Sequence, residues 1–176
     1  FDRKENKDVL AYLRLLVNPM DTISFRRAVN VPARGVGDTS LGKLEDYAEA
    51  REMSLLSAAN HIDAITEIKG KAMKGLADFA KLMEALQPML ETSAGEALRE
   101  VINRSGYRTM LASGTGEDLE RLENIEELIT AADEFDAELA TKTDGEIGKQ
   151  AGGSSNLALF LEHITLRSDQ DALKGN

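Results

Sequence analysis

"NVPARGVGDTSLGKL" occupies residues 30–44 and joins two stretches whose apolar spacing predicts helices. Gly35 and Gly37 flank a valine in it, an arrangement that lets the backbone turn sharply with a positive φ angle. The N–H groups that follow such a turn point outward at the start of the next helix, where anions bind readily. Four nearby side chains add hydroxyl groups or positive charge: Thr39, Ser40, Arg34 and Lys43. The stretch therefore predicts either a phosphate-holding turn or a helix connection that needs glycine for steric reasons alone.

Helical periodicity extends from this stretch in both directions, and no segment of any length alternates as a half-buried strand does. Asn18-Pro19 ends the first predicted helix, since the residue before a proline is pushed out of the helical region. Asp21 or Thr22 can cap the second, and Asp38, Thr39 or Ser40 can cap the third. The predicted helices cover residues 8–17, 23–30, 41–51, 53–62, 71–90, 94–104, 117–138 and 156–169. We therefore expect an all-α fold, a compact multi-helix domain with a helix–hairpin–helix-like glycine turn.

Two further segments qualify this outline. Residues 67–80 repeat the plan of a turn followed by a Lys-rich amphipathic helix, but Glu67 and Lys69 stand where Gly35 and Gly37 stand. A second phosphate contact is therefore not expected there. Residues 142–155 are rich in Gly, Ser, Thr and Lys, which predicts a mobile loop before the last helix.

Composition limits the classes of protein that remain. The chain has 176 residues, of which 42% are hydrophobic and 30% charged, typical of a globular domain. It has no cysteine, which excludes disulfides and thiolate metal sites and suits a reducing cytoplasm. No apolar stretch approaches the roughly 20 residues of a membrane span. Because the first residue is Phe rather than Met, we expect a piece excised from a longer chain.

Charge is distributed unevenly. The net charge of −10 argues against a simple nucleic-acid binder. Residues 1–43, however, carry eight Lys and Arg against five Asp and Glu, whereas residues 44–176 carry thirteen against twenty-six. The glycine turn thus lies in the basic part of an acidic chain. Ten carboxylates in residues 117–138 are typical of a solvated helix face. No phosphate loop, Ser-His-Asp arrangement or metal-ligand spacing is present, so the chain's own residues predict no catalytic site.

Several short motifs follow one another along the chain. They begin with Phe1, Arg3, Glu5, Lys7-Asp8, Ala11-Tyr12-Leu13-Arg14-Leu15, Asn18, Asp21, Asn30, Pro32 and Arg34-Gly35-Val36-Gly37. They continue with "SGYRTML" at 105–111, "RLENIEEL" at 121–128 and "LFLEHITLRSDQD" at 159–171. The first group resembles the start of the inserted 2B subdomain of bacterial superfamily 1 DNA helicases of the UvrD, PcrA and Rep type, and the later motifs resemble the rest of that subdomain in the same order. Asn6 and Val36 depart from the isoleucines usual in that family.

The resemblance implies that residues 1–176 form one helical accessory subdomain of an ATP-dependent 3′→5′ DNA helicase. ATP and Mg²⁺ would bind the parent enzyme outside this chain, which has no catalytic residue of its own. Duplex DNA at a single-strand/double-strand junction, the 1A, 1B and 2A domains and repair proteins are the implied partners, without a membrane. The expected DNA-binding residues are Lys7, Arg34, Gly35, Val36, Gly37, Asp38, Thr39, Ser40 and Lys43. The alternative is a protein-interaction or autoregulatory module that does not touch DNA.

Overall fold

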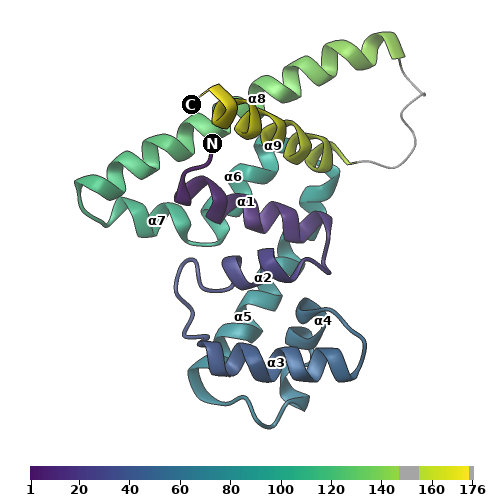
Figure 1. Ribbon diagram of the computed structural model, residues 1–176, viewed down its shortest axis with the longest axis vertical. Helices are drawn as coiled ribbons and strands as arrows, with labels where there is room; N and C mark the ends of the chain where they lie inside the picture. Colours follow the sequence, from purple (N-terminus) through teal and green to yellow (C-terminus); the bar gives the residue numbers. More distant parts are fainter. Residues whose placement is uncertain (147–154, 175–176) are drawn as a thin grey trace.

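The computed structural model describes residues 1–146 and 155–174, and every regular element within these ranges is helical. This confirms the all-α prediction for the described part of the chain. Figure 1 shows α1 and α7 near the middle of the long axis, α3, α4 and α5 towards one end, and α8 and α9 towards the other. The elements are α1 (Lys4–Val17), α2 (Thr22–Ala28), α3 (Asp38–Ala50), α4 (Leu55–Asn60), η1 (Ile62–Ala64), α5 (Gly70–Leu86), η2 (Gln87–Glu91), α6 (Ala94–Arg104), α7 (Tyr107–Ala112), α8 (Gly116–Glu146) and α9 (Asn156–Lys174).

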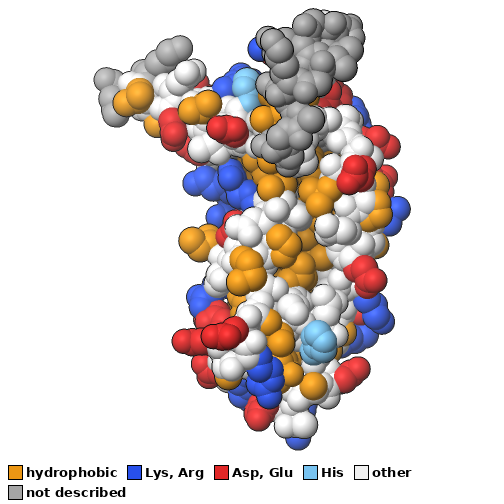
Figure 2. Space-filling model, turned by 90° about the vertical axis from the view of Figure 1, so that its right-hand side faces the viewer, with side chains coloured by type: hydrophobic (Ala, Val, Ile, Leu, Met, Phe, Trp, Pro, Cys, Tyr) orange, Lys and Arg blue, Asp and Glu red, His pale blue; other side chains and the backbone are white. Residues whose placement is uncertain are grey.

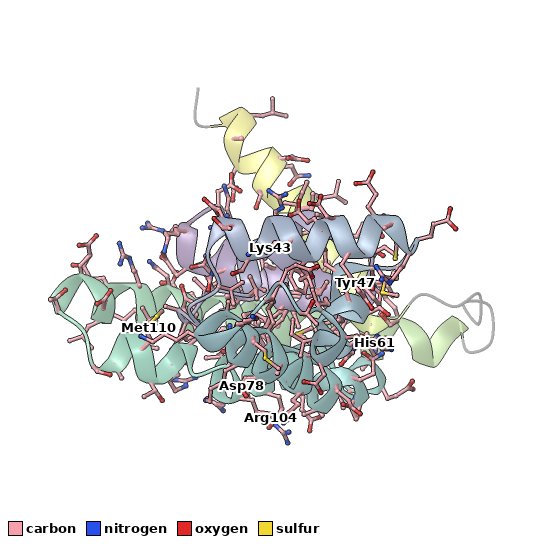
Figure 3. All side chains as sticks on the ribbon, turned by 90° about the horizontal axis from the view of Figure 1, so that it is seen from below. Lys43, Tyr47, His61, Asp78, Arg104 and Met110 are labelled. Carbon is pink, nitrogen blue, oxygen red and sulfur yellow. The ribbon has the colours of Figure 1, made fainter. Side chains whose placement is uncertain are left out.

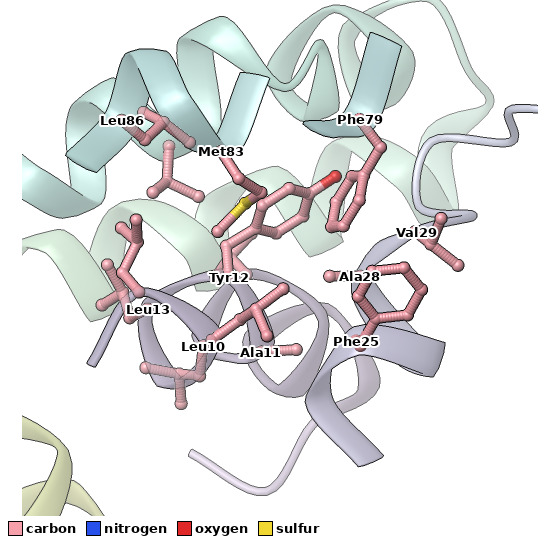
Figure 4. Packing of buried hydrophobic residues seen from close by; sticks show 14 of the residues in the cluster. Leu10, Ala11, Tyr12, Leu13, Phe25, Ala28, Val29, Phe79, Met83 and Leu86 are labelled. Atoms are coloured by element: carbon pink, nitrogen blue, oxygen red, sulfur yellow. The ribbon is translucent and has the colours of Figure 1, made fainter. Parts of the chain in front are cut away.

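The core forms around α1, which packs against α2, α6, α8 and α9. Its apolar residues recur on a broad face, so the helix is buried along most of its length. Tyr12 of α1 and Phe25 of α2 both contact Phe79 of α5, with ring centroids 5.9 and 5.3 Å away (Figure 4). This aromatic cluster joins the end of the molecule that holds the glycine turn to the rest of the core.

Local chemistry explains several helix boundaries. The Asp21 carboxylate accepts a hydrogen bond from the Ser24 N–H at 3.0 Å and so caps α2, as predicted. Ser93 caps α6 in the same way through the N–H of Glu96. The left-handed conformation of Gly106, with φ of 85°, follows the end of α6 at Ser105.

Other boundaries differ from the prediction. α1 begins at Lys4 instead of residue 8, and α9 continues past Asp169 to Lys174. α8 runs to Glu146, so residues 142–146 of the expected loop are helical, while residues 147–154 lie outside the described residues. Starting a helix is costly, but each residue added to an existing helix gains one backbone hydrogen bond. A helix can therefore extend through polar residues that would not form a helix on their own.

A buried polar cluster fixes α1 against its neighbours. The carboxylate of Asp8, which is 2% exposed, accepts hydrogen bonds from the Tyr107 hydroxyl and the Arg27 Nε, both at 2.8 Å. Lys4 adds an ion pair at 3.5 Å. Burial, followed by the hydrogen bond to Asp8, raises the pKa of Tyr107 well above its usual value. The cluster ties α1, α2 and α7 together.

The surface mixes charge with exposed apolar groups. Figure 2 shows hydrophobic side chains gathered down the middle of one face, with acidic and basic side chains along its flanks. Within the described residues, no helix combines the length and the apolar character that crossing a membrane requires.

Candidate nucleic-acid interface

The glycine turn is built from residues 30–37. Gly35 takes φ of 74°, a left-handed conformation that side chains other than glycine rarely adopt. The Val36 side chain is 2% exposed and packs inward. Gly37 is extended, with φ of −83° and ψ of 174°, and it is the N-cap residue of α3. The apolar residue thus faces the core while both glycines lie at the surface.

Asn30 holds this turn from within. Its side-chain oxygen accepts hydrogen bonds from the N–H groups of Val36, at 3.2 Å, and Arg34, at 3.3 Å. Its amide nitrogen donates to the carbonyl of Val36. One side chain therefore fixes both ends of a short loop. Sequence reasoning did not identify this role, although Asn30 belongs to the quoted motif.

Arg34 faces inward instead of toward the outer surface of the turn. Its Nη1 donates to the carbonyls of Ala28 and Val29, both at 3.0 Å, at the C-terminal end of α2. A cation there complements the helix dipole. Its guanidinium carbon lies 5.2 Å from the centroid of the Phe79 ring and 5.8 Å from that of Tyr12. Arg34, which was expected to lie beside a phosphate, thus supports the turn from its buried side.

The outer side of the turn presents backbone donors. α3 begins at Asp38, three residues before the predicted start, and no side chain caps it. The prediction that Asp38, Thr39 or Ser40 caps this helix was therefore wrong. The first N–H groups of a helix have no partner within that helix. Asp38 and Thr39 are exposed and Ser40 is partly exposed, so the N–H groups of the first turn lie at the surface.

The remaining expected residues lie apart from the turn. Lys43, one turn further along α3, donates from Nζ to the carbonyl of Glu67 at 3.0 Å. Figure 3 shows Lys43 and Tyr47 along α3 at this end of the molecule. Lys7 lies on α1 and lines a different hollow of about 290 Å³ together with Phe1 and Ile23. The structure therefore brings residues 34–40 together and separates them from Lys7.

The second hairpin repeats part of the first. Ile68 is 2% exposed, as Val36 is, and α5 begins at Gly70 without a side-chain cap. Gly70 takes φ of 63°. The second hairpin therefore also contains a residue with a positive φ, although Glu67 and Lys69 stand where the first hairpin has its two glycines. The repeated sequence plan in residues 67–80 was the signal that predicted this likeness between the two hairpins.

The two hairpins are in direct contact. A Cβ placed on Gly75 of α5 would lie 2.1 Å from the carbonyl oxygen of Arg34, closer than any Cβ can approach. A Cβ on Gly35 would lie 3.2 Å from the Cβ of Lys71. A hollow of about 450 Å³ lies at this contact and is also lined by Lys74 and Asp78. Sequence reasoning did not assign these α5 residues to the site.

No metal centre accompanies this arrangement among the described side chains: nowhere in residues 1–142 or 155–173 do three His, Cys, Asp or Glu side chains group so that they could hold a metal ion. The described chemistry is that of exposed backbone donors and lysines, which suits an anion held without covalent change.

Comparison with known proteins identifies the family. The profile of the UvrD-like helicase C-terminal domain matches residues 1–174. ATP-dependent DNA helicase PcrA of Bacillus subtilis is 39% identical over 175 residues, which cover 98% of this chain and 22% of that protein. ATP-dependent DNA helicase UvrD1 of Mycobacterium leprae is 34% identical over 185 residues, covering 100% and 24%. The chain thus spans about a quarter of the length of these relatives. It belongs to the family of UvrD-like helicase C-terminal domains.

Proposed function

We propose that this chain is the 2B accessory subdomain of an ATP-dependent 3′→5′ DNA helicase and contacts duplex DNA at a single-strand/double-strand junction. The observation that carries the proposal is the start of α3, where a glycine turn held by Asn30 and Arg34 presents uncapped N–H groups to solvent. The relatives named above are DNA helicases, which supports DNA as the source of the anion.

The proposed contact is with phosphate and is independent of base sequence. Backbone N–H groups of residues 37–40 would donate to phosphate oxygens, and the hydroxyls of Thr39 and Ser40 would assist. Asp38 would contribute only its N–H group, because its carboxylate repels phosphate. Val36 and Arg34 would position the turn from inside, since the N–H of Val36 is bonded to Asn30. Phosphate contacts position a duplex and carry no sequence information.

The chemistry of ATP would belong to other parts of the parent protein. We assign no ATP or Mg²⁺ ligand to this chain. The 1A and 2A domains of the parent would supply those ligands, and the 1B domain would be a further partner domain of the same cytoplasmic enzyme. The role of this chain would be to hold the duplex and so modulate unwinding. Lys7 and Lys43 are secondary candidates for DNA contact, because each lies away from the first turn of α3.

The test uses the full-length helicase and a short fluorescent duplex with a 3′ single-stranded tail. Thr39→Glu adds a negative charge to the first turn of α3, where it suits the helix dipole and repels phosphate. We expect weaker duplex binding without loss of stability. Gly35→Ala with Gly37→Ala should also weaken binding, because Gly35 requires a positive φ. Gly42→Ala is the matched control, since its added methyl meets no atom within 4 Å. Unchanged affinity and unwinding in the first two variants would refute the proposal.

The autoregulatory alternative makes a different prediction. α8 carries the whole acidic run of residues 117–138, and many of the carboxylates in this run are exposed. If this helix acts by docking a partner or another domain, neutralising its exposed Glu residues will change unwinding while the Thr39→Glu variant binds duplex normally.

A further inference from the structure

Arg34 is bonded where the ends of two helices meet. Its Nη1 donates to the carbonyls of Ala28 and Val29 at the end of α2. Its Nη2 donates to the carbonyl of Ser105 at the end of α6, at 3.5 Å. The C-terminal end of a helix carries partial negative charge, so two helices attract the same guanidinium. The position of Arg34, and with it the start of the glycine turn, therefore depends on how α2 and α6 are placed.

Both helix ends are connected to the buried carboxylate of Asp8. After α6, the Ser105 hydroxyl oxygen accepts a hydrogen bond from the Tyr107 N–H at 3.2 Å, and the Tyr107 hydroxyl donates to Asp8 at 2.8 Å. On α2, Arg27 donates to the other oxygen of Asp8 and directly precedes the two carbonyls that hold the guanidinium. Two routes of bonded groups thus connect Asp8 to Arg34.

α1 also contacts the loop of the glycine turn directly. Tyr12 lies one helical turn after Asp8 and is fully buried. Its hydroxyl donates to the carbonyl of Val31, and its ring centroid lies 5.8 Å from the guanidinium carbon of Arg34. A displacement of α1 would therefore reach the turn through its own side chains as well as through α2 and α6.

Burial makes this network sensitive to small changes. Asp8 is 2% exposed, Tyr107 1% and Ser105 8%. Hydrogen bonds are stronger where water is excluded, and a buried polar group without a partner is costly. Solvent cannot replace a bond lost at Asp8, so the bonded groups must move to find new partners. The end of that movement is the guanidinium that supports the turn.

We propose that Asp8 and Tyr107 are positioning residues for the phosphate-holding turn and act on it through Arg34. This inference rests on the proposed function and adds the residues that set the geometry of the contact. Neither side chain would touch DNA, because both are buried. Their role would be to keep the N–H groups of residues 37–40 in the orientation that phosphate oxygens require.

The experiment measures the duplex affinity of the full-length helicase by fluorescence anisotropy in Tyr107→Phe, Arg34→Lys and the double variant. Phenylalanine removes only the hydroxyl, and lysine keeps the charge but cannot bond two helix ends with one planar group. We expect each single variant to lose about threefold to tenfold in affinity, as residues that couple separated groups do. The double variant should lose no more than Arg34→Lys alone, because Tyr107 acts through Arg34.

Asp136→Ala is the matched control for lost stability. The Asp136 carboxylate holds the start of α6 through two N–H groups, at the opposite end of that helix from Ser105. At a temperature where circular dichroism shows every variant to be folded, this control should bind duplex normally. Hydrogen exchange should rise in residues 34–40 of Tyr107→Phe and stay normal there in the control. Asp8→Asn keeps the volume of the side chain and is a second variant that should behave as Tyr107→Phe does.

The outcomes separate this inference from the proposed function. Normal duplex binding in Tyr107→Phe and Asp8→Asn, together with weakened binding in Thr39→Glu, overturns the inference and leaves the proposed function standing. Losses that multiply in the double variant also overturn it, since Tyr107 would then act independently of Arg34. An equal loss in Asp136→Ala overturns it as well, because lost stability alone would explain the effect. Normal binding in Thr39→Glu refutes the proposed function and the inference with it.

Discussion

Replacing Asn30 by alanine should destabilise the protein more than its position in a surface loop suggests. The substitution removes three hydrogen bonds, which join the Asn30 side chain to the N–H groups of Arg34 and Val36 and to the Val36 carbonyl. A neutral hydrogen bond contributes about 1 kcal/mol net, and buried groups left without a partner cost more. Water can reach part of this loop and replace some of the lost hydrogen bonds. We therefore expect the free energy of unfolding to fall by about 2 kcal/mol.

Urea denaturation followed by circular dichroism measures this loss, with the slope m as a check that the unfolded state is unchanged. For a chain of this size, 2 kcal/mol corresponds to a melting temperature lowered by about 4–8 °C. Asn18→Ala is the matched control, since the Asn18 side chain accepts one exposed hydrogen bond from the Met20 N–H at 3.1 Å. If Asn30→Ala costs no more than Asn18→Ala, the turn is not held by Asn30 and the reasoning fails.

Three further substitutions test other contacts. Tyr107→Phe removes the hydroxyl that donates to the buried Asp8 carboxylate and should cost about 1–2 kcal/mol in urea. Because the folded state raises the pKa of Tyr107, wild-type stability should be complete below about pH 10 and fall above it, and the variant should show less of this fall. Gly75→Ala should displace the Arg34 carbonyl, costing about 1–3 kcal/mol in urea and weakening duplex binding in anisotropy. Asp136→Ala should destabilise α6 by about 1 kcal/mol in urea, because this carboxylate accepts two N–H bonds at the start of the helix, at 2.9 and 2.8 Å.

Matched controls accompany these variants. Tyr47→Phe changes a tyrosine whose ring lies against Arg51 at the surface. Gly42→Ala adds a methyl group to α3 in open space and should be neutral or stabilising. Glu134→Ala removes an exposed carboxylate two residues before Asp136. A variant that behaves like its own control would show that the contact it removes contributes nothing measurable.

Local signals in the sequence predicted much of the fold. Asp21 caps α2 because a carboxylate before a helix satisfies its free N–H groups, and Gly106 follows α6 because glycine accepts a positive φ. The start of α3 was mispredicted for a related reason. N-cap preferences favour Asp, Thr or Ser as the N-cap residue. In α3, however, Gly37 is the N-cap residue and Asn30 stabilises the preceding turn.

The candidate site was predictable only in part. The conformation of Gly35 and the burial of Val36 followed from their own chemistry. The inward orientation of Arg34 did not, because it depends on carbonyls of α2 and on the ring of Phe79, which only the tertiary fold brings near. The position of Lys71 beside the turn likewise requires the packing of α5, which no local pattern states.

The contact between Gly75 and the Arg34 carbonyl has a mechanical consequence. With no side chain between the backbone of the turn and α5, neither element can slide past the other without a steric clash. The starts of α3 and α5 are therefore held at a constant distance from each other. If this chain moves as part of a larger protein, the starts of α3 and α5 will therefore move together as one rigid unit.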